Sequence, residues 1–546
     1  MKPIGIILTE ASTHEAKCQL YEHAEKGKVR EGMFLLVKTT EERQLLARIG
    51  RIVPQNDFFI AGDAWTEARR KEQRIPYELA RKYEICELEL LGEIPNLGEI
   101  STPPYAGDQV FRIDVARSLE EIFGITSKEG IIWYGTLVGY EGAPIPLTIE
   151  GIPMHMGVFG VTGSGKSYDV GALIERLVKI YAGENRVLSI PMLIIDANAD
   201  YLDYFQRFQE KGLFGASSFV TRYVFPNSPE MKRFKKNVEP IAMNLNNIFR
   251  RDLAELIVQY YSGGEKNELQ VAGIESLIEY MTSRGDIAEG DYQSIFVDED
   301  TFSRARSRLN ELTSELIHAA TAAAIVRGLE KFREIENQYR LLSTTPKIEL
   351  DFIDNLTKNR GIAVIDFSAD AAPGIPLSLK QLVISYLSSI LFLRFTDYKV
   401  KRDERYLLFI IEESQNYCPD LDVYDVGYSL AREKLSAIAT QGRKFGLSLC
   451  LVSQRPSFVD PIVLSMCNTF FIHRISPADV SFVKKVCGGL PPNLERRLTT
   501  MEQGEVIVTG QMNKAPFPML IKVPSREIPH TSGKTDVMAA LKRLAK

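Results

Sequence analysis

The sequence lacks the features that mark secreted, zinc-binding or membrane-spanning proteins. Its 546 residues include only six cysteines and six histidines, with no CxxC pair and no HExxH motif. This spacing argues against a disulfide framework, a structural zinc site and a zinc hydrolase. No run of about eighteen apolar residues occurs, and the opening MKPIGIILTEAS is too short and too soon acidic for a signal peptide. We therefore expect a cytoplasmic protein with no membrane partner.

The sequence also lacks a strong imbalance of charge. Its formal net charge is −5, with 45% hydrophobic and 25% charged residues, as in ordinary globular proteins. A mildly acidic chain can still carry a local basic channel, so net charge leaves a nucleic-acid partner open. The length exceeds that of one ordinary hydrophobic core and predicts about two to four domains.

What the sequence does contain is a phosphate-binding loop, GVTGSGKS, at residues 160–167. It fits G-x-x-x-x-G-K-[ST] in full, follows the apolar run HMGVF and precedes an amphipathic segment. These features favour a P-loop over a glycine-rich turn without a ligand. We predict ATP and Mg²⁺ as cofactors, with Lys166 reaching the β- and γ-phosphates and Ser167 binding Mg²⁺. The predicted nucleotide-binding residues are Gly160, Thr162, Gly163, Ser164, Gly165, Lys166, Ser167 and Tyr168.

Patterning along the chain predicts an organisation in several parts. Short β-rich runs predict a small barrel first, strand–helix alternation predicts a parallel sheet, and helical periodicity predicts an insertion inside the sheet domain. The predicted C-terminal tail either braces a neighbouring subunit or forms a surface helix. The predicted bounds are 1–100 for the barrel, 101–130 for a linker, 131–204 and 346–525 for the two parts of the ATPase core, 205–345 for the helical insertion and 526–546 for the tail.

Polar or acidic residues end several predicted strands, namely Asp196, Asp366, Glu412 and Gln454. Ligands of open α/β sheets bind outside the carboxyl ends of the strands, so we expect these side chains to converge on the P-loop. In RYLLFIIEESQ, alternation along the strand separates Glu412 from Glu413. Glu412 would face Mg²⁺, whereas Glu413 would turn toward the γ-phosphate and activate water. The alternative is a solvated acidic strand end.

Two further side chains are candidates for catalysis. Gln454, at a strand end, would sense the γ-phosphate, although an ordinary polar strand terminus needs no such partner. Arg443, in QGRKFG, would serve a neighbouring subunit's site as an arginine finger, or else contact solvent or DNA. Arg474, which ends FFIHR, is the rival candidate for the finger.

Several segments together carry a resemblance to a known family. They are GVTGSGKS, FIIEESQNYCP, GRKFGLSLCLVSQRPS, CNTFFIHRI and GEVIVTG. In order and spacing they resemble the HerA family of hexameric DNA-translocating ATPases, within the HerA/FtsK group of RecA-like P-loop motors. The resemblance implies an α/β fold with a RecA-like core on a parallel sheet, an N-terminal HAS-barrel-like β-barrel and a helical insertion. It also implies a homo-hexamer with double-stranded DNA in its pore and a partner nuclease of the NurA type or a defence effector.

The sequence departs from the family pattern at three places. DANADY at residues 196–201 replaces a DPHGEY-like stretch, EESQ replaces [DE]EAH, and Met154 stands where many relatives have a basic residue before the histidine, here His155. These departures indicate a divergent branch and favour anti-phage defence slightly over end resection.

The predicted function is ATP-driven translocation of duplex DNA for a partner nuclease or effector. Basic clusters are candidate phosphate contacts, although charge runs are usually solvated faces. A protein unfoldase is a weaker alternative, since no clear aromatic pore loop is present. The main alternative is an ATP-gated scaffold that licenses a partner enzyme without translocation. The clusters comprise Lys232, Arg233, Lys235 and Lys236, then Arg250 and Arg251, then Lys399, Lys401 and Arg402.

Overall fold

The computed structural model describes most of the chain and divides it into two compact units. Unit 1 comprises Met1–Ile149, Leu490–Met501 and Glu505–Pro524, and unit 2 comprises Glu150–Gly489, Glu502–Gly504 and the described residues from Ser525. The described residues are 2–25, 27–56, 58–76, 80–113, 115–140, 142–184, 186–201, 220–229, 231, 238–264, 267–313, 317–424 and 429–527.

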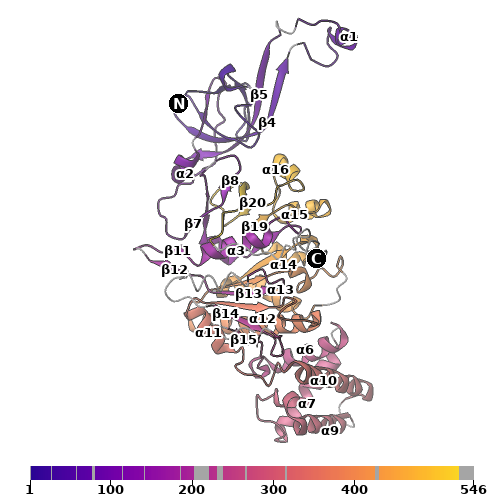
Figure 1. Cartoon of the computed structure of the whole chain (residues 1–546). Helices are drawn as coiled ribbons and strands as arrows, with labels where there is room; N and C mark the ends of the chain where they lie inside the picture. Colours follow the sequence, from indigo (N-terminus) through magenta and orange to yellow (C-terminus); the bar gives the residue numbers. More distant parts are fainter. Residues whose placement is uncertain are drawn as a thin grey trace, which may run out of the picture. The chain divides into compact units, whose positions relative to one another are not determined.

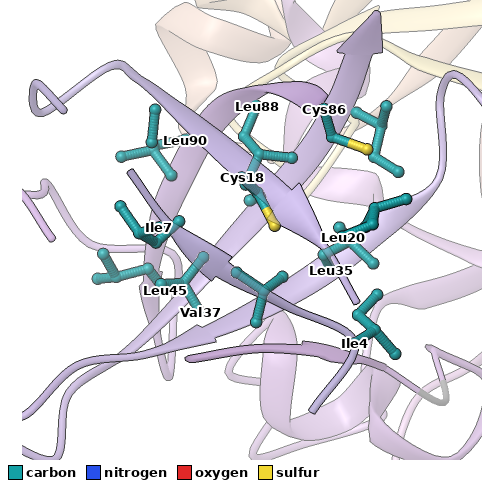
Figure 2. Close-up of a cluster of buried hydrophobic side chains, with 14 of the residues drawn as sticks. Ile4, Ile7, Cys18, Leu20, Leu35, Val37, Leu45, Cys86, Leu88 and Leu90 are labelled. Atoms are coloured by element: carbon teal, nitrogen blue, oxygen red, sulfur yellow. The ribbon is translucent and has the colours of Figure 1, made fainter. Parts of the chain in front are cut away.

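Unit 1 is built on a closed antiparallel barrel with the strand order β1-β2-β5-β4-β3-β6. Its strands are β1 (Gly5–Ile7), β2 (Glu15–Leu20), β3 (Phe34–Lys38), β4 (Gln44–Asn56), β5 (Lys82–Ile94) and β6 (Gln109–Arg112). Alternate side chains point inward, and Figure 2 shows Ile7, Cys18 and Leu35 among the apolar residues that fill the barrel. The small N-terminal barrel predicted from the sequence is confirmed. Its last strand, β6, lies in the stretch that we assigned to the linker.

Strands β4 and β5 continue beyond the barrel as a long hairpin, which carries the short helix α1 (Thr66–Arg70) near its tip (Figure 1). Unit 1 also contains β7 (Ile131–Tyr134) paired with β9 (Ile145–Thr148). A further antiparallel group of three strands pairs β20 (Glu505–Gly510) with β21 (Met519–Lys522) and β21 with β8 (Thr136–Leu137). The helix α16 (Pro492–Arg497) completes this unit.

Unit 2 is built on a parallel sheet with the strand order β15-β14-β16-β13-β17-β18-β10-β19. The strands are β10 (Met156–Phe159), β13 (Met192–Asp196), β14 (Val220–Val224), β15 (Val238–Pro240), β16 (Ile362–Asp366), β17 (Leu407–Ile411), β18 (Leu447–Ser453) and β19 (Thr469–Ile472). The central strands are buried along their whole length, as an α/β sheet covered on both faces requires. This arrangement confirms the predicted α/β fold with a parallel sheet.

Four amphipathic helices gather at one end of unit 2 in Figure 1, and they form the predicted helical insertion. They are α6 (Arg250–Ser262), α7 (Glu268–Ser283), α9 (Glu299–Thr313) and α10 (Ala319–Tyr339). The predicted range 205–345 is not wholly helical, because it also contains strands β14 and β15. Both strands are short, so the longer helical patterns around them dominate the sequence signal.

Helix α12 (Leu377–Lys401) is long and apolar enough to cross a membrane by length and composition alone. Two observations favour a core helix. Of its most apolar window, 67% is buried within the structure, and it packs against α11 (Leu350–Lys358), α13 (Arg432–Gln441) and strand β18.

Candidate active site

The P-loop joins strand β10 to helix α3 (Lys166–Leu177) and has a backbone that only glycine suits at several positions. Gly163 and Gly165 have φ values of 77° and 104°, in the left-handed region. A Cβ on Gly160 would lie 2.5 Å from Ser164 Oγ and 2.7 Å from His473 Cβ. The loop is held from outside as well, since the Gly504 N–H donates to the Ser164 carbonyl over 3.0 Å.

A buried hydrogen bond joins the start of helix α3 to the end of strand β19. His473 Nε2 and Asp169 Oδ2 are 2.9 Å apart, and both side chains are buried. Asp169 belongs to the first turn of α3, and His473 directly follows strand β19. The pair therefore fixes the P-loop helix to that strand. The sequence analysis quoted His473 only inside a family motif, because nothing local in the sequence indicates its partner.

Tyr168, a predicted nucleotide-binding residue, is engaged by the chain after β21. Its hydroxyl accepts a hydrogen bond from the Arg526 N–H over 2.9 Å, and the Arg526 guanidinium lies 5.4 Å from the centre of its ring. Arg526 is also buried next to Glu175 of α3. The beginning of the predicted C-terminal tail thus packs on the P-loop helix, whereas its residues 528–546 lie outside the described part of the chain.

Glu412 is buried at the carboxyl end of β17 with one oxygen left unsatisfied. The Tyr201 hydroxyl donates to Glu412 Oε1 over 2.8 Å. Oε2 is buried without a hydrogen-bond partner among the described residues. Burial raises the pKa of Glu412 to about 7, helped by the charge of Asp200 and opposed by that of Lys166.

Asp196 organises the DANADY turn beside Glu412. Its carboxylate accepts from the backbone N–H groups of Asn198, Asp200 and Tyr201. Burial and the neighbouring charges of Glu412 and Asp366 raise the pKa of Asp196 well above its usual range. Tyr201 reaches Glu412 from this turn, so the aromatic residue retained in the divergent motif has a structural explanation.

The donor set near Glu412 fits Mg²⁺. Among the described residues, no group of three or more His, Cys, Asp or Glu side chains is arranged to hold a metal ion. Mg²⁺ in nucleotide sites needs no such cage, because one or two protein oxygens and the phosphates complete its shell. The unsatisfied Glu412 oxygen and the half-buried Ser167 hydroxyl are oxygen donors of that kind.

Glu413 lies in a chain of hydrogen bonds that begins in the P-loop. Thr162 Oγ1 donates to Gln454 Oε1 over 2.7 Å, and Gln454 Nε2 donates to Glu413 Oε1 over 2.6 Å. Gln415 Nε2 donates to the other Glu413 oxygen over 2.5 Å, and Ser453 Oγ donates to Gln415 Oε1 over 2.8 Å. A φ of 50° at Glu413 turns the chain out of the strand direction. The structure thus brings Thr162, Gln454 and Glu413 together.

Gln415 is a member of this chain that the sequence analysis missed. The EESQ segment was noted only as a departure from [DE]EAH. The available signal was its spacing, since Gln415 stands two residues after Glu413, where the backbone leaves the strand. Its contact with Ser453 comes from the neighbouring strand β18 and depends on the folded sheet.

The two candidate arginines lie at opposite ends of the parallel strands. Arg443 is exposed in the turn before β18, and its charge helps to lower the pKa of His155, which precedes β10. Arg443 is therefore at the amino ends of these strands, and the P-loop is at the carboxyl end. Arg474 follows β19 instead, and its carbonyl accepts from the Val161 N–H of the P-loop over 2.9 Å. Only Arg474 is next to the P-loop of its own chain.

His155 bridges two elements beneath the sheet. Its Nδ1 accepts from the Leu449 N–H and its Nε2 donates to the Ala439 carbonyl, each over 2.9 Å. Burial lowers the pKa of His155 to about 4, so the ring is neutral at physiological pH. This bridge joins the start of β10 to α13 and β18.

The predicted basic clusters differ in how much positive charge they leave available. Arg250 Nη1 lies 3.7 Å from Glu279 Oε2, and Arg251 Nη2 lies 2.8 Å from Glu268 Oε2. Lys401 pairs with Asp397, while Lys399 and Arg402 are exposed at the end of α12. The first cluster, Lys232, Arg233, Lys235 and Lys236, lies outside the described residues.

Comparison with known proteins agrees with the resemblance that the motifs carry. Residues 132–391 match the family model described as Helicase HerA, central domain. The chain is 22% identical to the DNA double-strand break repair helicase HerA of Sulfolobus acidocaldarius, over 96% of this chain and 93% of that protein. It is 24% identical to the HerA of Saccharolobus solfataricus, over 94% and 91%.

Among solved structures, VirB4 of Thermoanaerobacter pseudethanolicus is similar with a TM-score of 0.47 and 13% identity, over 74% of this chain and 98% of that chain. The family match and the long alignments with curated helicases agree with the motif order. The chain is similar to HerA helicases over most of its length, its residues 132–391 match the central domain of those helicases, and it is an ATPase of the P-loop class.

Proposed function

We propose that this protein is a homo-hexameric ATPase that pumps duplex DNA through a central pore and works with a partner nuclease or effector. The observation that carries the proposal is the hydrogen-bond chain from Thr162 through Gln454 to Glu413. It connects the P-loop to the carboxylate best placed to activate water. A motor needs such a connection, because the bound nucleotide must decide when the chemical machinery changes conformation.

Each predicted site residue takes a role in this mechanism. Backbone N–H groups of residues 160–165 cradle the phosphates, and Lys166 neutralises charge on the β- and γ-phosphates. Ser167 and Glu412 hold Mg²⁺, which when bound offsets the charge on the phosphate oxygens. Burial of Lys166, which is 8% exposed, strengthens its interaction with an anion.

Glu413 is the proposed general base and Gln454 the proposed sensor. A carboxylate has about four lone-pair positions, so two amide donors orient Glu413 and leave positions free to accept a proton from water. Gln454 reports the state of the P-loop through Thr162. When the γ-phosphate arrives, competition for these amide and hydroxyl groups would alter how Glu413 is held.

An arginine supplied by a neighbouring subunit completes the proposed cycle. Arg443 is exposed and lies at the amino ends of the strands, whereas its own P-loop lies at their carboxyl ends. This position supports a role in trans rather than in cis. A guanidinium in trans stabilises charge in the transition state and makes hydrolysis depend on the neighbour's position. Arg474 remains the alternative, with a contact to its own P-loop.

The proposed polymer is duplex DNA, and the proposed location is the cytoplasm. Two of the relatives are named for double-strand break repair, which supports a DNA substrate. The divergent DANADY and EESQ segments favour a partner effector in anti-phage defence over a NurA-type nuclease. Lys399 and Arg402 are the better candidates for DNA phosphates, because the acids of the insertion already pair with Arg250 and Arg251.

One observation favours a second function. Both Glu413 oxygens are engaged by amides in the structure, as expected of a slow ATPase that switches a scaffold on and licenses a partner enzyme. Measurement of ATPase rate without DNA, with short duplexes and with long duplexes separates the two. Several-fold stimulation that grows with duplex length supports the translocase. No response to DNA, with activity only after a partner is added, supports the scaffold.

A further inference from the structure

Unit 1 contains a cavity of about 370 Å³ that is separate from the P-loop. Three segments line it, namely the residues that lead into β3 (Arg30–Phe34), the turn at the end of β8 (Leu137–Tyr140) and helix α16. Arg48 of β4 and Leu520 of β21 complete the lining. Volumes of this size suit a small organic ligand. The segments come from both ends of the chain, yet they belong to one compact unit.

Four arginines line the cavity, and three of them are held in place by acceptors. Arg48, whose side chain is 3% exposed, donates to Glu89 and to the Pro518 carbonyl. Arg30 donates to the Gly139 carbonyl, and Arg497 donates to Glu505 over 2.9 Å. A guanidinium has five N–H donors, so each of the three retains donors beyond these bonds.

The fourth arginine leaves the cavity with positive charge in excess. Arg496 is exposed and forms no side-chain hydrogen bond or ion pair within the part of the chain that the structure describes. Of the residues that line the cavity, four are arginines and one, Glu31, is a carboxylate. Glu89 pairs with Arg48 and Glu505 pairs with Arg497. The excess of arginine in the lining favours an anionic ligand.

Apolar and aromatic side chains also line the cavity. The rings of Phe34 and Tyr140 lie 5.9 Å apart, and the Tyr140 hydroxyl is fixed by the Phe34 backbone. Met33, Leu494 and Leu520 add aliphatic surface. A ligand that fills this space combines a flat apolar body with an anionic group.

We propose that the cavity is a second nucleotide site, which binds a nucleoside monophosphate group. Arginine forks match phosphate oxygens in geometry and charge, so Arg30 and Arg496 hold the phosphate. The base lies against Met33, Phe34 and Tyr140. Two sources present this chemistry, a free mononucleotide and a nucleotide in an unpaired DNA strand. The proposal does not rest on the translocase function, because no residue of the hydrolysis site takes part.

The experiment uses the full chain with Lys166→Ala, which disables the P-loop, and AMP as the probe in isothermal titration calorimetry. We expect AMP to bind this protein. Adding Arg496→Gln should weaken AMP affinity about ten- to hundred-fold, as expected for a charge-assisted hydrogen bond. Arg30→Gln gives an independent test. The matched control is Arg51→Gln, since Arg51 is an exposed residue of β4 outside the cavity. This substitution should leave AMP affinity unchanged.

Three results would overturn the proposal. The first is no AMP binding to the Lys166→Ala protein. The second is an AMP affinity that stays the same as in the Lys166→Ala protein when Arg496→Gln or Arg30→Gln is added. The third is inorganic phosphate binding as tightly as AMP. A short single-stranded oligonucleotide distinguishes the sources. Arg496-dependent binding of AMP alone assigns a free nucleotide, whereas Arg496-dependent binding that is much tighter for the oligonucleotide assigns an unpaired strand.

Discussion

Replacing Gln454 with alanine tests the hydrogen-bond chain that connects the P-loop to Glu413. The substitution removes the 2.6 Å hydrogen bond to a carboxylate that we propose as the general base. Hydrogen bonds to charged groups contribute about 1.5 to 3 kcal/mol. If this bond orients Glu413 in the transition state, its loss lowers kcat about ten- to hundred-fold.

The chain also predicts how two substitutions combine. Thr162→Val removes the hydroxyl that donates to Gln454 over 2.7 Å, and the loss of a neutral hydrogen bond should lower kcat about two- to ten-fold. In the Gln454→Ala protein the same Thr162 substitution should have little further effect, because its partner is already absent. A double-mutant cycle on steady-state kcat at saturating ATP and Mg²⁺ measures this coupling.

Gln511→Ala is the matched control for this cycle, since Gln511 is exposed and belongs to unit 1. It should retain wild-type turnover. The reasoning is refuted if Gln454→Ala leaves kcat unchanged. It is refuted equally if the Thr162 and Gln454 effects multiply as independent losses, because the two residues would then act separately.

Three further predictions address the base, the trans arginine and a buried histidine. Glu413→Gln should bind ATP with unchanged affinity while kcat falls about 10²- to 10⁴-fold, and near-normal turnover would reassign the base. Arg443→Ala should abolish hydrolysis, and mixing it with Lys166→Ala should partly restore activity in co-assembled rings, whereas absence of rescue counts against action in trans. Burial lowers the pKa of His155 from 6.5 to about 4, so its neutral form stabilises the fold fully above pH 6.5 and progressively less as pH falls toward 4, by about 3 kcal/mol at most. Thermal unfolding midpoints should therefore fall more steeply below pH 6.5 in the wild type than in His155→Gln, and parallel profiles would contradict this.

The sequence predicted those parts of the fold that local patterns determine. The P-loop has a motif whose glycines are required by its backbone, and it occurs between β10 and α3 as expected. Buried strands of a parallel sheet are continuous apolar runs, so β13, β17 and β18 were visible in the sequence. The barrel was visible from its short alternating runs and turns.

Those local patterns could not predict contacts between residues that are far apart in the sequence. Tyr201 and Glu412 are far apart in the chain and meet only because β13 and β17 are neighbours in the sheet. The His473–Asp169 pair and the Gln415–Ser453 bond likewise depend on strand order. Strands β14 and β15 were missed for a different reason, because short strands next to long amphipathic helices contribute little to periodicity.

Displacement of a third DNA strand from a long duplex measures translocation most directly. A triplex-forming oligonucleotide is placed far from the duplex end, and its release is followed after ATP and Mg²⁺ are added to the assembled protein. We predict release by the wild-type protein, with a delay that grows with the distance to the triplex, and no release by Glu413→Gln. Rapid DNA-stimulated hydrolysis without any strand release would contradict a translocating motor.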